Sequence, residues 1–326
     1  MKIKQQLTAL VAAGVLAHAL PAEATPTRYT PEGMLSLARV GAADLSPDGK
    51  TLVYSVGFPN LQANKIQSQL FRIAADGSSR KQLTSNIAGV HSPRWIQQGK
   101  RIAFLSSESG SQQVWTMAPD GSERKQLTDI EGGLSDFLLS PDETKIAYIK
   151  EIPFGKSTKD LYPDLPKATG RIITDLMYKH WDEWTETIPH IFIAELGASP
   201  VKGGKDILEG EPYEAPTKPF GGAEELSWSP DGKTLAYSSR KKVGMEYALS
   251  TNTDIYLYDL VSGQTKNVTA PNGGYDTHPR FSPDGKSLSW ISMERDGYEA
   301  DLKRLFVLDL KTGKKTYLTD GFEYDV

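Results

Sequence analysis

The amino-acid sequence predicts an all-β fold, a β-propeller of four-stranded blades, from two recurring turn signals. A Ser-Pro-Asp turn, with Pro setting φ at its first corner and Gly supplying a positive φ, precedes an apolar run in each repeat. Its copies begin at Ser46, Ser140, Ser229 and Ser282, with a degraded copy at residues 96–100. A second hairpin signal follows, at Asp76-Gly77, Asp120-Gly121, Ser262-Gly263 and Thr312-Gly313. Two hairpins in each period of roughly 40 to 50 residues are typical of a propeller blade.

The N-terminal segment, residues 1–24, reads as an export signal. Lys2 and Lys4 precede an apolar run at residues 7–20, and Ala22-Glu23-Ala24 forms a small-x-small cleavage site. We therefore expect cleavage after Ala24 and a periplasmic or secreted location for the mature domain, residues 25–326. A short helix should follow, with Thr30 as N-cap and Pro31 at its first position.

The repeats place five blades at about residues 40–84, 90–128, 135–208, 224–269 and 278–319. The third blade contains an insertion of about 40 residues before its third strand at residues 191–194. Within the insertion, the helical spacing of its apolar residues predicts a helix from about Arg171 to Lys179 that packs onto the propeller. These apolar residues are Ile172, Ile173, Leu176 and Met177.

The end of the sequence resembles the start of another blade. The next Ser-Pro-Asp turn begins 12 residues after Thr128 and 13 after Thr269, but only 7 residues follow Thr319. We therefore expect a chain that is truncated at the start of a sixth blade.

Composition excludes several classes of function. The net charge of −4 provides no basic field for nucleic acid, and the absence of cysteine removes disulfides and thiolate chemistry. The sequence contains no Gly-x-Ser-x-Gly nucleophile elbow, no phosphate-binding glycine loop and no His-Glu-x-x-His zinc helix. We thus assign no catalytic, cofactor-binding or metal-binding residue. We also expect no nucleic-acid partner, and no membrane association after signal removal.

The irregular connections of the predicted propeller all fall between second and third strands. They span residues 150–189, 240–252 and 293–303, and because strands alternate in direction they should project from one face. Such loops on a rigid scaffold usually carry function. Their carboxylates are either solvated or ion-paired, or one or two of them converge on a cation such as a peptide α-ammonium.

Three segments resemble a known family. They are Asp175-Leu176-Met177-Tyr178-Lys179-His180-Trp181-Asp182-Glu183-Trp184, Ser250-Thr251-Asn252-Thr253-Asp254-Ile255-Tyr256 and Gly297-Tyr298-Glu299-Ala300-Asp301. Together with the repeats, they make the chain similar to the propeller of the prolyl oligopeptidase family of serine peptidases, and more narrowly to bacterial dipeptidyl-peptidase 5-like members.

The resemblance implies a peptide substrate and a partner α/β-hydrolase domain, absent from this chain, that carries the catalytic Ser, Asp and His. The propeller would then cover the active site, admit short or unfolded peptides and bind the substrate N-terminus. Its substrate-facing candidates are Trp181, Asp182, Glu183, Tyr298 and Glu299.

Two other functions are compatible with the repeats. One is a stand-alone periplasmic propeller of the TolB type that acts through protein contacts, although the long insertion and the helix at Pro31 argue against it. The other is a five-bladed glycan-binding or glycosidase propeller. That function needs inward carboxylates on the first strands, where the sequence has Leu139, Trp228 and Phe281.

Overall fold

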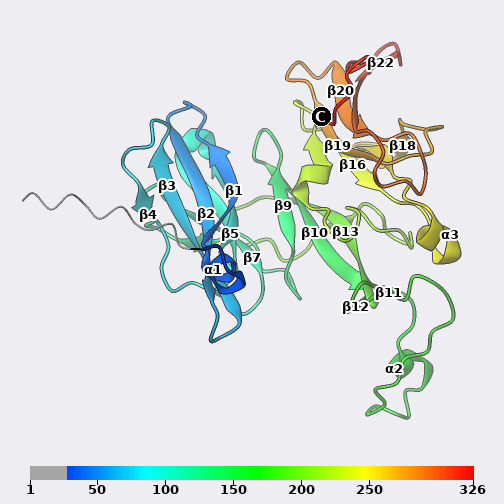
Figure 1. Ribbon diagram of the computed structural model, residues 1–326, viewed down its shortest axis with the longest axis horizontal. Helices are drawn as coiled ribbons and strands as arrows, with labels where there is room; N and C mark the ends of the chain where they lie inside the picture. Colours follow the sequence, from blue (N-terminus) through cyan, green and yellow to red (C-terminus); the bar gives the residue numbers. More distant parts are fainter. Residues whose placement is uncertain (1–27) are drawn as a thin grey trace, which may run out of the picture.

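The computed structural model describes residues 28–326 and consists mainly of β-strands (Figure 1). Within this range, five antiparallel four-stranded sheets succeed one another along the chain, and their strands pair in sequence order. The predicted signal peptide, residues 1–24, lies outside the described residues. The arrangement is the all-β propeller architecture that the turn signals predict.

The strand bounds are as follows. The first sheet contains β1 (Arg39–Leu45), β2 (Thr51–Asn60), β3 (Lys65–Ala74) and β4 (Lys81–Gln82). The second contains β5 (His91–Ile96), β6 (Arg101–Ser106), β7 (Gln113–Met117) and β8 (Lys125–Gln126). The third contains β9 (Asp136–Leu139), β10 (Lys145–Pro153), β13 (Thr187–Glu195) and β14 (Lys205–Asp206). The fourth contains β15 (Leu226–Trp228), β16 (Thr234–Ser239), β17 (Asp254–Asp259) and β18 (Thr265–Asn267). The fifth contains β19 (Asp276–Phe281), β20 (Ser287–Ser292), β21 (Arg304–Asp309) and β22 (Lys315–Tyr317).

The Ser-Pro-Asp turns share one hydrogen-bond pattern. In the first, Ser46 Oγ donates to Asp48 Oδ1 at 2.6 Å, and the Lys50 N–H donates to the same oxygen at 3.1 Å. The Thr51 N–H then donates to Ser46 Oγ at 2.9 Å, and Gly49 has a φ of 70°. The side chains thus satisfy the backbone groups at the hairpin end, which explains why the Ser-Pro-Asp motif recurs.

The first, second, fourth and fifth blades also end on a threonine that joins their third and fourth strands. Thr84 Oγ1 accepts from the Leu70 N–H at 2.8 Å and donates to Gln69 Oε1 at 2.9 Å. Thr128 accepts from the Val114 N–H at 2.9 Å in the same way. The Leu-Thr and Val-Thr pairs at the ends of these four sheets therefore close a hydrogen-bonded corner in each.

The apolar cores lie between consecutive sheets. Leu70 and Val53 pack with Phe104 and Ile102 between the first two sheets. A second core joins the second and third sheets, a third joins the third and fourth, and a fourth joins the fourth and fifth. Because each sheet buries one face against each neighbour, the sheets stack along the chain, as the colour order of Figure 1 shows.

Two short helices test the sequence predictions. Helix α1 (Pro31–Ser36) confirms the expected start, because Thr30 Oγ1 accepts from the Gly33 N–H at 3.0 Å. The helix predicted over residues 171–179 is wrong. The insertion instead contains α2 (Thr158–Leu161) and a small hairpin of β11 (Lys179–His180) and β12 (Glu183–Trp184).

The predicted packing of the apolar stripe is also wrong. Ile172, Ile173 and Leu176 are 46, 47 and 45% exposed, and only Met177 of the four stripe residues is half-buried, so the stripe does not form a buried face. Two local features oppose a helix there. Consecutive β-branched residues have poor helix propensity, and the Asp175 side chain accepts from the backbone N–H of Leu176 at 2.8 Å.

Candidate functional site

Three long second-to-third connections meet on one side of the molecule. They are residues 154–186 in the third sheet, 240–253 in the fourth and 293–303 in the fifth. Ser250 Oγ donates to the carboxylate of Asp296 at 2.7 and 2.8 Å, which links the last two. Asp175 of the first lies directly against Gly244 of the second. These contacts agree with the expectation that the connections share a face.

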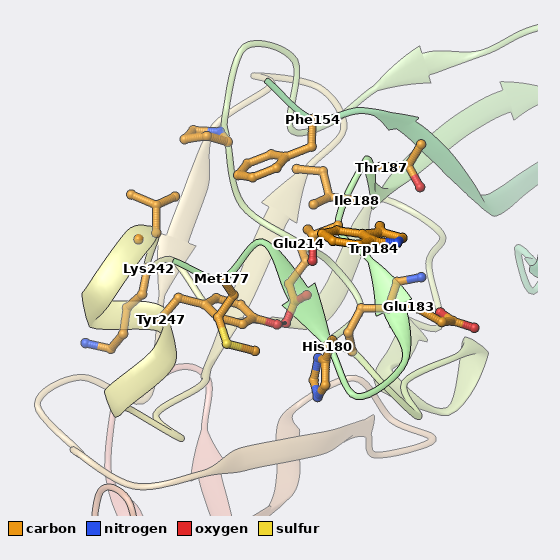
Figure 2. Close-up of a pocket in the computed structure, with 15 residues that line it drawn as sticks. Phe154, Met177, His180, Glu183, Trp184, Thr187, Ile188, Glu214, Lys242 and Tyr247 are labelled. Carbon is orange, nitrogen blue, oxygen red and sulfur yellow. Dashed lines mark hydrogen bonds between the residues drawn. The ribbon is translucent and has the colours of Figure 1, made fainter. Parts of the chain in front are cut away.

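A cavity of about 90 Å³ lies between the third-sheet and fourth-sheet connections, and we call it the Glu214 cavity. Figure 2 shows its lining. Its apolar walls are Phe154, Met177, Trp184, Ile188 and the ring of Tyr247. Glu214, His180 and Glu183 supply polar groups, with Lys218 and Lys242 also in the lining. Tyr247 belongs to helix α3 (Gly244–Leu249), which the sequence analysis did not predict.

Glu214 is the buried acid of this cavity. It is only 4% exposed, and Tyr247 Oη donates to its Oε1 at 2.8 Å. The Arg240 guanidinium stacks over the Tyr247 ring with its Cζ 4.7 Å from the ring centroid. Burial raises the pKa of Glu214 to about 7, against the lowering effects of the Tyr247 hydrogen bond and the charge of Arg240. Near neutral pH this carboxyl is therefore close to its titration midpoint, and a bound cation would favour its ionised form.

His180 lies beside Glu183 in the lining and has its pKa lowered. Desolvation is the largest cause, followed by the charges of Arg240 and Lys218, while Glu183 and Glu299 act in the opposite direction. Lys218 is itself paired with Glu151, with Nζ and Oε1 2.7 Å apart. The imidazole is thus neutral at pH 7 and can accept or donate a hydrogen bond without adding positive charge.

The structure brings together only part of the predicted substrate-facing set. Glu183 lines the cavity, and Glu299 is close enough to influence His180. Trp181 is 71% exposed outside the lining, with its ring edge-to-face to Phe220 at 5.3 Å between centroids. Asp182 is also exposed, and Tyr298 lies beneath the Arg295 guanidinium, 4.1 Å from its Cζ to the ring centroid.

Several other carboxylates of this face have structural partners. Asp301 pairs with Arg295 at 2.9 Å, and Asp296 accepts from backbone N–H groups of Thr251 and Asn252. Glu214 and Tyr247 are not among the residues predicted from the sequence. Glu214 lies in a Pro-rich stretch between the third and fourth sheets, and the only available signal was an acid flanked by apolar residues and prolines.

Within residues 28–326, no group of three or more His, Asp or Glu side chains is arranged to hold a metal ion. None of the helices described is long and apolar enough to span a membrane.

Comparison with known proteins identifies relatives over almost the whole chain. No protein-family model matches. Dipeptidyl-peptidase 5 of Porphyromonas gingivalis is 58% identical over 99% of this chain and 48% of its own length. The chain is a homologue of dipeptidyl-peptidase 5. Proteins of the same name from Porphyromonas endodontalis and Aspergillus fumigatus are 52% and 26% identical, over 86% and 93% of this chain. The resemblance seen in the sequence is therefore confirmed.

The match covers only part of these dipeptidyl-peptidase 5 relatives, because the chain spans about half of their length or less. Among solved structures, an acylaminoacyl peptidase bound to Z-Gly-Gly-Phe-chloromethyl ketone superposes with a TM-score of 0.63. It is 14% identical, over 90% of this chain and 41% of that one. A puromycin-hydrolyzing peptidase of Mycobacterium tuberculosis gives a TM-score of 0.52 at 15% identity, over 86% and 37%. These two likenesses show the fold, and the dipeptidyl-peptidase 5 homology supports a peptidase-related role.

Proposed function

We propose that this chain is the propeller part of an exported serine exopeptidase that releases dipeptides, and that it admits peptides and binds their N-terminus. The 58% identity to a dipeptidyl-peptidase 5 over 99% of the chain is the observation that carries the proposal. Peptide-bond cleavage would require a serine, an aspartate and a histidine of an α/β-hydrolase domain outside this sequence.

The Glu214 cavity supplies the chemistry for N-terminus binding. An α-ammonium is a cation with N–H donors, and a buried carboxylate bonds such a group more strongly than it bonds a neutral donor.

Glu214 replaces Asp182 and Glu183 as the main ammonium-binding group in this proposal. Of these three carboxylates it is the buried one, so its interaction with a cation is screened least by water. Glu183 at the rim contributes a weaker attraction because it is exposed.

The test measures peptide binding by the 326-residue chain with isothermal calorimetry. We expect a dipeptide amide with a free amine to bind and its N-acetyl form to bind at least tenfold more weakly. Glu214→Gln should lose about 1.5–3 kcal/mol of binding free energy, the value of a hydrogen bond to a charged group. Glu246→Gln, the same change at an exposed position of α3, is the matched control and should bind as the parent does. Equal binding of the free and acetylated peptides would refute the proposed recognition.

Export is part of the proposal and rests on the composition of residues 1–24. We expect the protein in a periplasmic or secreted fraction to begin at Thr25, as determined by N-terminal sequencing. Recovery of the chain only in the cytoplasm with residues 1–24 intact would contradict it.

A further inference from the structure

We infer that the end of the propeller axis that carries the Ser-Pro-Asp turns binds a small oxyanion, a phosphate or carboxylate group, between the guanidinium groups of Arg94 and Arg280. This site is separate from the Glu214 cavity and from the proposed N-terminus binding, because neither arginine lines that cavity. Three features support it: the matching positions of the two arginines, the absence of an acidic partner for either in the described part of the chain, and the N–H groups that they keep for a ligand.

Arg94 and Arg280 hold matching positions in the second and fifth sheets. Each lies in a first strand, two residues before a copy of the Ser-Pro-Asp turn, which for Arg94 is the degraded copy at residues 96–100. Each follows a proline and a residue with positive φ, Ser92 at 49° and His278 at 56°. In both strands the pairing register shifts just before the arginine, and such a bulge changes the direction of nearby side chains. The two guanidinium groups are thus placed at the same level of the axis.

First strands form the inner edge of the sheets. In Figure 1, β1 and β9 face the middle of the molecule, while β4 lies at its outer edge. The residue two positions before the turn contacts the next sheet along this inner edge. Asp44 accepts from the Trp95 N–H at 2.7 Å. Ser227 accepts from the Phe281 N–H at 3.2 Å. Because strands alternate in direction, the two arginines lie on the inner edge at the end away from the long second-to-third connections.

Neither guanidinium has an ion-pair partner in the described part of the chain. Arg280 uses a single nitrogen, Nη1, to donate to three backbone carbonyls at 2.7–3.3 Å, those of Glu224, Leu226 and Pro279. Its Nε and Nη2 have no partner among the described residues, and the side chain is exposed. Arg94 Nε is buried and has no hydrogen-bond partner in the same range. Each arginine therefore keeps N–H donors for a ligand.

The charges of the two arginines affect each other. Desolvation is the first cause that lowers the pKa of Arg280, the charge of Glu224 raises it, and the charge of Arg94 lowers it further. A guanidinium stays protonated at neutral pH, so the two positive charges repel each other. An oxyanion between them would offset this repulsion and accept N–H groups from both, in the forked geometry that guanidinium offers to carboxylate and phosphate.

Acids near the inner edge limit the affinity. Asp136 accepts from the Ala223 N–H at 2.9 Å, and Glu224 accepts from the Gly222 N–H at 2.9 Å. These hydrogen bonds hold the carboxylates on the backbone but do not cancel their charge, which weakens the attraction of the site for an anion. We therefore expect a dissociation constant of about 1 mM, which corresponds to about two hydrogen bonds to charged groups.

The experiment measures the midpoint of thermal unfolding of the 326-residue chain in sodium phosphate and in sodium chloride at equal pH and ionic strength. A ligand that binds the folded chain raises this midpoint, and about 20 mM phosphate should raise it by about 3 °C relative to chloride. Sodium acetate at the same concentration is the second arm, and it distinguishes a carboxylate ligand from a phosphate ligand.

Variants separate site binding from the general stabilisation that phosphate gives by its exclusion from protein surfaces. Arg94→Gln and Arg280→Gln should each weaken phosphate binding at least tenfold and reduce the rise to about 1 °C or less. Arg80→Gln, the same change at an exposed arginine between β3 and β4, is the matched control and should keep the full rise. If Arg280→Gln fails to fold because its bonds to the carbonyls are lost, Arg94→Gln decides, since no such bond is recorded for Arg94 among the described residues.

The outcomes are distinct. A rise in phosphate that depends on Arg94, with or without a similar rise in acetate, supports the oxyanion site, and the acetate arm then states whether a carboxylate is accepted. A rise in acetate alone that depends on Arg94 supports a site for carboxylates. An equal rise in the parent and Arg94→Gln, or no rise in either salt, would overturn the inference.

Discussion

A buried acid at the junction of the fourth and fifth sheets should make the stability of the fold depend on pH. Glu225 is 2% exposed, and its carboxylate accepts from the Thr217 N–H at 2.9 Å and from Thr217 Oγ1 at 2.7 Å. Thr277 of β19 donates to it at 3.4 Å, so Glu225 joins the fifth sheet to the connection between the third and fourth sheets. Burial is the largest effect and raises the pKa of Glu225 from 4.5 to about 7, because desolvation outweighs these hydrogen bonds.

The sign of the effect follows from proton binding. A group whose pKa is raised on folding contributes stability that is fully present below its unfolded pKa and is lost as the pH rises through its folded pKa. The shift from 4.5 to about 7, at about 1.4 kcal/mol per pH unit, amounts to about 3 kcal/mol in full. About 2 kcal/mol of this is lost between about pH 5.5 and about pH 8.5.

The assay is urea unfolding of the parent and of Glu225→Gln at both pH values. The glutamine cannot ionise, so the variant should lose about 2 kcal/mol less stability than the parent as the pH is raised between these values. Glu246→Gln, the same change at an exposed position of α3, is the matched control and should lose as much stability as the parent does. If parent and Glu225→Gln lose the same stability as the pH rises, Glu225 does not titrate in this window and the reasoning is wrong.

Two further predictions concern single hydroxyl groups. Tyr247→Phe removes the hydrogen bond that lowers the pKa of Glu214, so the pH midpoint for dipeptide-amide binding should move upward. If affinity falls while the midpoint stays the same, Tyr247 only packs in the cavity wall and does not set the pKa of Glu214. Thr128→Val removes the buried acceptor of the Val114 N–H and should cost about 1–3 kcal/mol in the free energy of unfolding by urea. Thr144→Val, which removes an exposed hydroxyl, serves as its control, and an equal cost in both would contradict the role of the corner.

The fold was predictable because its signals are local. Ser46, Asp48 and Gly49 determine one hairpin through bonds that span at most five residues, and the same chemistry repeats in later sheets. The N-cap at Thr30 is equally local. Sequence alone therefore predicted the all-β fold and the expected start of α1.

The site was less predictable because its contacts join distant segments. Glu214 meets Tyr247 across 33 residues, and Thr277 meets Glu225 across 52. No periodicity encodes such pairs, and burial, which determines the pKa of both acids, becomes visible only in the folded chain. The wrong helix at residues 171–179 has a related cause. Apolar spacing alone did not account for the poor helix propensity of Ile172 and Ile173 or for the bond from the Leu176 N–H to the Asp175 side chain.

The placement of the Glu214 cavity between elements of the third and fourth sheets has a thermodynamic consequence. Phe154 and Trp184 belong to the third-sheet connection and Tyr247 to the fourth-sheet connection, so a ligand would contact both sides of one inter-sheet boundary. A ligand that binds only when both sides are in place stabilises that boundary by RT ln(1 + [L]/Kd), which is about 2.7 kcal/mol at a hundredfold excess over Kd. A bound peptide would thus hold the third and fourth sheets together reversibly. Amide hydrogens along β13 and β16 should therefore exchange more slowly while the peptide is bound.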